Sequence, residues 1–123
     1  MRAVLIKDGK GPAENLYIGD APTPTPGPGQ VLVKIQTFGL NRMDIIQRNG
    51  AYPVPAGASQ ILGVEFGGTV VELGDPPAEV DQSAEEQALR DALKRWKKGD
   101  EVFGLAYGVS CISLMCLFCA RWL

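Results

Sequence analysis

Hydrophobic and polar residues alternate most clearly over Val31–Thr37. Val31, Val33 and Ile35 share one face of an extended segment, and the opposite face is partly polar, which is typical of a strand with one buried side. Shorter apolar runs bounded by Gly, Pro and Asp predict further strands at residues 2–6, 16–19, 61–73 and 101–106. The pattern therefore predicts several short strands joined by sharp turns.

Two stretches have helical signals instead. Residues 41–48 can form a short helix, with Asn41 as its N-cap, Asp44 in its first turn and Gly50 after its end. Residues 83–97 predict an amphipathic helix, because Ser83 and Glu86 have capping-box spacing and apolar residues recur on one face. Helices thus interrupt the strands at two places.

The segment 21–29 holds four prolines and two glycines in nine residues, so it predicts an extended surface connector. Short strands with turns between them and two attached helices predict a mainly β fold, a partly open barrel. A chain of 123 residues has room for one such domain and not for two.

Composition narrows the classes of function. Hydrophobic residues make up 46% and charged residues 21%, as in an ordinary soluble domain, and a net charge of −2 gives no basic surface for nucleic acid. No histidine is present, which excludes histidine-dependent catalysis and histidine ligation. Lys7 and Asp8 closely follow the first apolar run, so it lacks the apolar core of a signal peptide, and we expect a cytoplasmic protein.

An ordered set of short motifs spans residues 11–102. The motifs are Gly11-Pro12 with Glu14-Asn15-Leu16, Pro26-Gly27-x-Gly29-Gln30-Val31-Leu32-Val33-Lys34, Leu40-Asn41-x-x-Asp44, Arg48-x-Gly50-x-Tyr52, Leu62-Gly63-x-Glu65-x-x-Gly68-x-Val70 and Gly99-Asp100-x-Val102. In this order and spacing the chain resembles the medium-chain dehydrogenase/reductases, specifically their zinc-free quinone oxidoreductase branch. The resemblance covers residues 1 to about 108.

The resemblance implies a GroES-like N-terminal domain over residues 1–108 with a helical insertion at about 76–98. It also implies NADPH as cofactor, a small-molecule quinone as acceptor and a homo-oligomeric assembly for the family. The doubly wound nucleotide-binding Rossmann domain that follows in the family, with its G-x-G-x-x-G turn, is absent from the 123 residues. Zinc-dependent relatives have a cysteine at the position of Asn41 and a histidine at that of Val64, so the resemblance implies no metal.

By the same resemblance, Asn41 would bind the cofactor, and Tyr52 would face the quinone as its catalytic and substrate-binding residue. From the residues alone, Asn41 is equally a helix cap and Tyr52 a loop aromatic packed on prolines. Asp44 is interpreted as a first-turn charge rather than a catalytic acid, and Glu65 as a paired, partly buried carboxylate supporting the cleft.

The C-terminal segment 109–123 departs from the family motifs, and the sequence allows three interpretations of it. Residues 102–120 carry no charge over 19 residues, which is long enough for a membrane anchor, although 102–106 also belong to a predicted strand. Cys111, Cys116 and Cys119 have the spacing of three ligands of an iron–sulfur site without the fourth. The sequence favours the third interpretation, a non-family apolar tail of a truncated chain, poorly packed and exposing apolar surface.

The sequence thus predicts an oxidoreductase family member: the N-terminal part of an NADPH-dependent, zinc-free quinone oxidoreductase. Because most cofactor contacts in such enzymes come from the nucleotide-binding domain, the chain alone is expected to be inactive. The alternative is a non-catalytic GroES-like binding module, or a membrane-anchored fragment, that pairs with full-length subunits.

Overall fold

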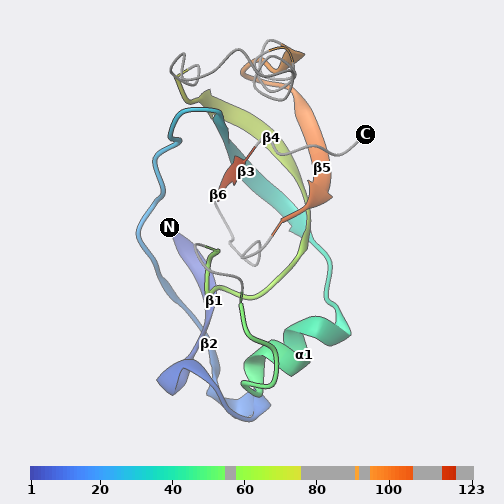
Figure 1. The fold of residues 1–123 in the computed structure, drawn as a ribbon. Helices are drawn as coiled ribbons and strands as arrows, with labels where there is room; N and C mark the ends of the chain where they lie inside the picture. Colours follow the sequence, from blue (N-terminus) through green and yellow to red (C-terminus); the bar gives the residue numbers. More distant parts are fainter. Residues whose placement is uncertain (55–57, 76–90, 92–94, 107–114, 119–123) are drawn as a thin grey trace.

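The computed structural model describes residues 1–54, 58–75, 91, 95–106 and 115–118, which form two antiparallel sheets and a short helix (Figure 1). The first sheet is a hairpin of β1 (Arg2–Ile6) and β2 (Leu16–Asp20), joined through two 3-10 turns. The strands predicted at residues 2–6 and 16–19 are confirmed.

The second sheet has four strands in the order β5-β4-β3-β6. Their bounds are β3 (Gln30–Phe38), β4 (Glu65–Leu73), β5 (Glu101–Leu105) and β6 (Met115–Phe118). Every neighbouring pair is antiparallel. Since no described strand joins this sheet to the hairpin, the two sheets do not close, and the predicted mainly β, partly open fold is confirmed.

The core lies on one face of the four-stranded sheet. It is made by Val31, Val33 and Ile35 of β3 with Phe66 and Val70 of β4. The three β3 residues are those whose alternation predicted a buried face, so that prediction is confirmed. Val33 and Val70 have no exposed surface, because β3 and β4 are the two inner strands of the sheet.

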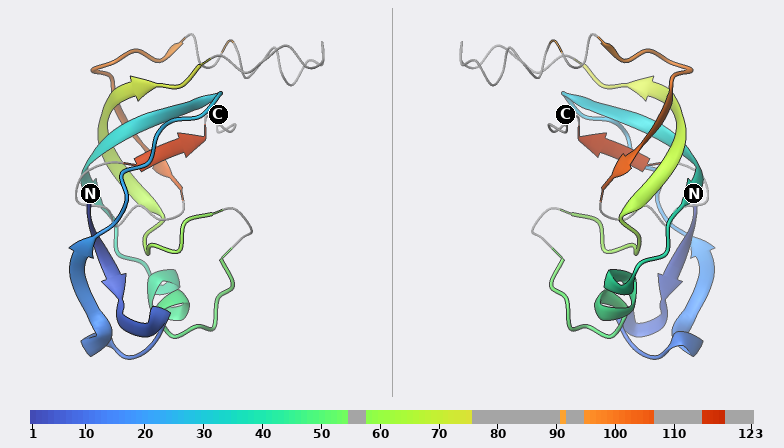
Figure 2. Two further views of the ribbon diagram at one scale, coloured as in Figure 1. Left: turned by 90° about the vertical axis from the view of Figure 1, so that its left-hand side faces the viewer. Right: turned by 90° about the vertical axis from the view of Figure 1, so that its right-hand side faces the viewer.

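The helix α1 (Arg42–Arg48) lies beside the hairpin at the same end of the molecule (Figures 1 and 2). Two hydrogen bonds join them: the Gly11 N–H donates to the Arg48 carbonyl oxygen (2.9 Å), and Arg48 Nε donates to the Gly11 carbonyl oxygen (3.1 Å). Asn41 is the N-cap residue, as predicted. The helix thus connects the hairpin turn to the long chain segment that leads into β4.

Strand β4 begins four residues later than the apolar run predicted. Gly63 has φ of +94°, a left-handed conformation that a strand does not contain, and its N–H bonds to a side chain instead of a neighbouring strand. Residues 61–64 therefore form a loop, and the ladder starts at Glu65.

Four residues of the C-terminal segment form a strand that the sequence did not predict. Met115–Phe118 pairs with Gln30–Val33 of β3, so the backbone of these four residues is part of the sheet and is not unpacked. The rest of that segment, including Cys111 and Cys119, lies outside the described residues, and so does the iron–sulfur interpretation. Of the predicted helix at 83–97, the described residues Asp91 and Arg95 are helical, whereas Trp96 and Lys97 are not, so the helix ends before the predicted boundary.

Within the described ranges, no helix is both long enough and apolar enough to cross a membrane.

Candidate functional site

The carboxylate of Asp44 connects the start of α1 to the loop before β4. Its Oδ2 accepts a hydrogen bond from the Asn41 N–H (2.7 Å), and its Oδ1 accepts one from the Gly63 N–H (2.9 Å). Asp44 is buried, with 8% of its surface exposed, so these bonds form away from water and are strong. The interpretation of Asp44 as a mere first-turn charge was therefore incomplete: it fixes Asn41 and Gly63 relative to each other.

Asn41 sits at the start of α1 with extended backbone angles, φ −125° and ψ 156°. Its Nδ2 is buried and has no hydrogen-bond partner among the described residues. A buried amide donor without a partner costs free energy and is therefore uncommon in folded proteins. This donor is available to a bound acceptor atom.

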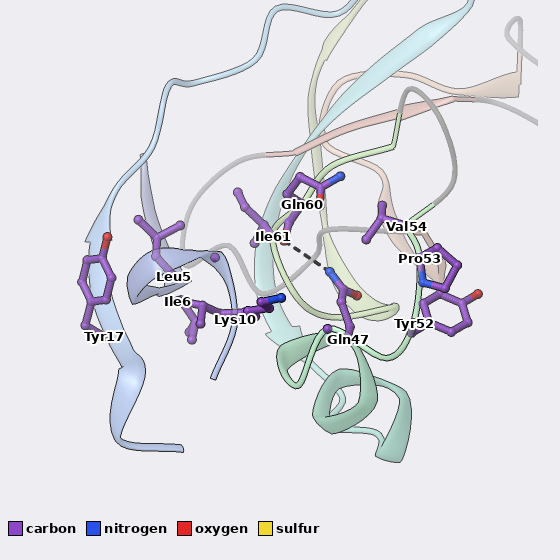
Figure 3. Close-up of a pocket in the computed structure, with 13 residues that line it drawn as sticks. Leu5, Ile6, Lys10, Tyr17, Gln47, Tyr52, Pro53, Val54, Gln60 and Ile61 are labelled. Carbon is purple, nitrogen blue, oxygen red and sulfur yellow. Dashed lines mark hydrogen bonds between the residues drawn. The ribbon is translucent and has the colours of Figure 1, made fainter. Parts of the chain in front are cut away.

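Tyr52 lies in the loop after α1 and is half-buried. It lines a cavity of about 470 Å³ between the hairpin, α1 and the loop that precedes β4, and Asn41 does not line that cavity. In Figure 3 the Tyr52 hydroxyl points away from Lys10 and the hairpin. Asn41 precedes α1 and Tyr52 follows it. The structure does not bring the two residues into one pocket.

Val64, which precedes β4, and Glu65, the first residue of β4, differ in burial and contacts. Val64 is half-buried, and its carbonyl oxygen accepts a hydrogen bond from the Ala106 N–H (2.8 Å). Glu65 is exposed, so its predicted role as a partly buried supporting carboxylate was wrong. The reason is the strand alternation: Phe66 points into the core, and its neighbour Glu65 must therefore point outward.

A second hollow lies at the start of β4, lined by residues of β3, β4 and β5 and by Gly39. Phe103 of β5 contributes to it and is 91% exposed. Among the described residues, no group of three or more acidic or cysteine side chains is arranged to hold a metal ion.

The cavity around Tyr52 was not anticipated from the sequence. Its wall combines residues of three separate elements, including Lys10 from the hairpin turn and Gln47 from α1. A local pattern could not have joined them, because they lie 37 residues apart in the chain.

Comparison with known proteins identifies the domain. The family model described as "Alcohol dehydrogenase GroES-like domain" matches residues 27–121. The chain belongs to this family. The matched range continues through β6 and includes most of residues 109–123, while a domain boundary at residue 108 stays a prediction.

Several relatives are oxidoreductases. The chain is 36% identical over 91 residues to the enoyl reductase cheB of Chaetomium globosum, covering 74% of this chain and 20% of the relative. It is 27% identical over 103 residues to the quinone oxidoreductase of Lama guanicoe, covering 84% and 26%. A solved quinone oxidoreductase from Pseudomonas syringae superposes with a TM-score of 0.64 at 30% identity, covering 95% of this chain and 31% of that one.

The chain therefore spans between a fifth and a third of the length of these relatives. What it shares with them is the N-terminal domain of medium-chain dehydrogenase/reductase oxidoreductases, the domain that the sequence motifs had indicated.

Proposed function

We propose that this domain is the catalytic-domain part of an NADPH-dependent quinone oxidoreductase that works without zinc. The observation that carries the proposal is the buried Nδ2 of Asn41, a hydrogen-bond donor without a partner in the described part of the chain, at the start of α1. Such a donor fits an oxygen atom of the nicotinamide or of the acceptor. The quinone oxidoreductases among the relatives support the same acceptor class.

The nicotinamide, when bound, supplies the hydride. The contribution of this chain is to hold the reactants and to donate hydrogen bonds where negative charge develops on the acceptor oxygen. Asn41 Nδ2 is one such donor, and its orientation is fixed because Asp44 holds the Asn41 backbone N–H. Tyr52 is proposed to face the quinone and to donate from its hydroxyl, which points away from the hairpin (Figure 3).

The side chains at the positions of the zinc ligands support chemistry without a metal. At the two positions where zinc-dependent relatives have a thiolate and an imidazole, this chain has the neutral amide of Asn41 and the hydrocarbon of Val64. Neither side chain replaces those ligands at a tetrahedral zinc site. The neighbouring Glu65 is exposed and is left without a role in this proposal.

An enoyl thioester is the second acceptor class, and the relatives give a specific reason for it. Enoyl reductases of Chaetomium globosum and Aspergillus flavipes are each 36% identical to this chain over the matched residues. Quinones and enoyl carbonyl compounds share a carbon–carbon double bond conjugated to a carbonyl group, so a hydride can add to both and leave charge on the oxygen. The two classes are therefore tested together.

The 123 residues alone are proposed to turn over little or nothing. The residues that distinguish NADPH from NADH contact the ribose and belong to the nucleotide-binding domain of such enzymes. The 123 residues do not contain that domain, so the preference for NADPH would be set outside them. The alternative is a non-catalytic module that pairs with full-length subunits. The proposal includes a cytoplasmic location, because the first apolar run lacks the core of a signal peptide, and a homo-oligomeric assembly of the whole enzyme, as the resemblance to the family implies.

The test compares the chain by itself with the chain fused to the nucleotide-binding domain of the Pseudomonas syringae relative. Each is incubated with NADPH and either a small quinone or an enoyl thioester, and loss of the reduced nicotinamide is followed. We expect turnover by the fusion with the quinone and almost none by the chain alone. A folded fusion that binds NADPH but reduces neither acceptor would contradict the proposal and favour the non-catalytic module.

A further inference from the structure

The cavity between the hairpin, α1 and the loop containing Tyr52 is a candidate binding site in its own right. Its volume of about 470 Å³ falls within the range of about 300–1,000 Å³ that is usual for small-molecule sites. Its walls are mostly apolar, and the side chains that approach it come from both sides in Figure 3: Leu5 and Ile6 from the hairpin, and Val54 and Ile61 from the loop.

Hydrogen bonds hold the three walls together. Gly11 and Arg48 exchange two bonds between the hairpin turn and the end of α1. Gln47 Nε2 donates to the Gln60 carbonyl oxygen (3.2 Å), which joins α1 to the loop. Gln47 is itself buried, with 8% of its surface exposed. The part of the cavity wall formed by Gln47 and Gln60 is therefore held in place without a ligand.

Lys10 is the single charged residue among the described residues that line the cavity. Its side chain extends from the hairpin turn toward Gln47 in Figure 3, and its aliphatic part covers Gly50: a Cβ placed on Gly50 would lie 2.9 Å from Lys10 Cδ. No acidic side chain in the described ranges forms an ion pair with it. An apolar cavity with one unpaired cation at its edge fits a molecule that has an apolar body and a single anionic group.

We propose that this cavity binds a small amphiphilic anion, an aliphatic or aromatic carboxylate, with Lys10 pairing with the carboxylate. Asn41 does not line the cavity, whereas Tyr52, which is proposed to face the quinone with its hydroxyl, forms part of the cavity wall. The inference does not depend on the proposed oxidoreductase function, since binding is measured on the chain as it exists without nicotinamide or quinone.

The probe is decanoate, with decanamide as its uncharged counterpart, and binding to the isotope-labelled chain is followed by NMR. We expect decanoate to shift the side-chain amide signals of Gln47 and the backbone signals of Gly50 and Ile61. The signal of Phe103, which lines the other hollow, should stay in place. Decanamide is expected to bind about fivefold more weakly, the effect of one partly exposed charge pair.

Two variants and a control localise the site. Lys10→Met should reduce decanoate affinity about fivefold and leave decanamide affinity unchanged, whereas Lys7→Met, an equal change of charge on an exposed residue that does not line the cavity, should leave both unchanged. Val54→Trp should fill the cavity and abolish binding of both compounds.

Lys10 also lies beside the last turn of α1, where a cation stabilises the helix dipole without any ligand. If Lys10→Met lowers only the free energy of unfolding and decanoate affinity is unchanged, the anion site is refuted. Saturable binding that survives Val54→Trp, or no binding of either compound at millimolar concentration, would refute it as well.

Discussion

The carboxylate of Asp44 bonds to the backbone N–H of Gly63, 19 residues further along the chain, at 2.9 Å. Through its second oxygen the same carboxylate holds the Asn41 N–H, so one buried side chain fixes the start of α1 and the loop before β4. A capping interaction is normally local. Here it is extended into a tertiary contact, and the geometry of the proposed site depends on it.

Replacing Asp44 should therefore affect the whole domain. Asp44→Ala leaves the buried Gly63 N–H and the partly buried Asn41 N–H without acceptors, and we expect it to lower the free energy of unfolding by about 3 kcal/mol. Asp44→Asn keeps one acceptor oxygen and should cost less. Urea unfolding measures both, with Asp20→Ala, an exposed carboxylate of β2, as the control that should change stability by less than about 0.5 kcal/mol. Equal stability of Asp44→Ala and Asp20→Ala would contradict the bridge.

The two strand glycines Gly68 and Gly104 should differ in their tolerance of a side chain. A Cβ on Gly68 would collide with the Lys34 carbonyl oxygen and lie 2.8 Å from Val33 Cγ1, whereas one on Gly104 would meet its nearest neighbour, the Phe66 ring, at an ordinary 3.5 Å. We expect Gly68→Ala to lower the free energy of unfolding by about 2 kcal/mol and Gly104→Ala to change it by less than about 0.5 kcal/mol. Thermal unfolding of the two variants is the measurement, and the reverse order would be inconsistent with the pairing of β3 and β4.

The edge strand β5 should promote self-association. It is an outer strand of the four-stranded sheet, and it exposes 91% of Phe103 and 63% of Leu105. Exposed apolar edges of this kind pair with other chains. Phe103→Lys should reduce the average mass seen in sedimentation at high protein concentration, while the unfolding free energy changes by less than about 0.5 kcal/mol, since little buried surface is lost. Unaltered association would exclude β5 as its source.

The proposed role of Asn41 is testable in the fusion with a nucleotide-binding domain. Asn41→Ala removes the buried donor, and we expect kcat/KM to fall about tenfold, the equivalent of one hydrogen bond of about 1.4 kcal/mol. Asn49→Ala, an exposed asparagine at the other end of α1, should have no effect on turnover. A normal rate for Asn41→Ala would restrict Asn41 to its capping role.

Tyr52 can be examined in the same fusion by removing its hydroxyl alone. Tyr52→Phe keeps the ring that lines the cavity and should raise KM for the quinone about threefold to tenfold, with KM for NADPH unchanged. Tyr52→Leu would show whether the ring matters in addition. If Tyr52→Phe behaves as the parent protein does, the hydroxyl has no part in acceptor binding.

The sequence was sufficient for the features that depend on neighbouring residues. Val31, Val33 and Ile35 alternate with polar neighbours, and they are the buried face of β3 in the structure. Asparagine is a residue type favoured at helix N-caps, and Asn41 is the N-cap of α1. These features follow from period-two and capping patterns within a few residues.

What the sequence did not predict depends on distant parts of the chain. The Gly63 N–H bonds to Asp44 instead of to a neighbouring strand, so β4 begins after the predicted boundary. Nothing near Gly63 in the sequence indicates this partner. Glu65 was expected inside because its neighbours are apolar, yet the direction of a strand side chain is set by the register with β3 and β5. The same limit explains why the pairing of Met115–Phe118 with β3 was not foreseen.

The position of α1 also has a consequence for how the domain unfolds. At seven residues, this helix is too short to be stable by itself. It is held at one end by the loop before β4 through Asp44 and at the other by the hairpin through Arg48. Loss of either contact frees the helix and with it the other contact. The hairpin and the four-stranded sheet, although they share no described strand pairing, should therefore open as one cooperative unit, with the amide protons of Gly11 and Gly63 exchanging at matched rates.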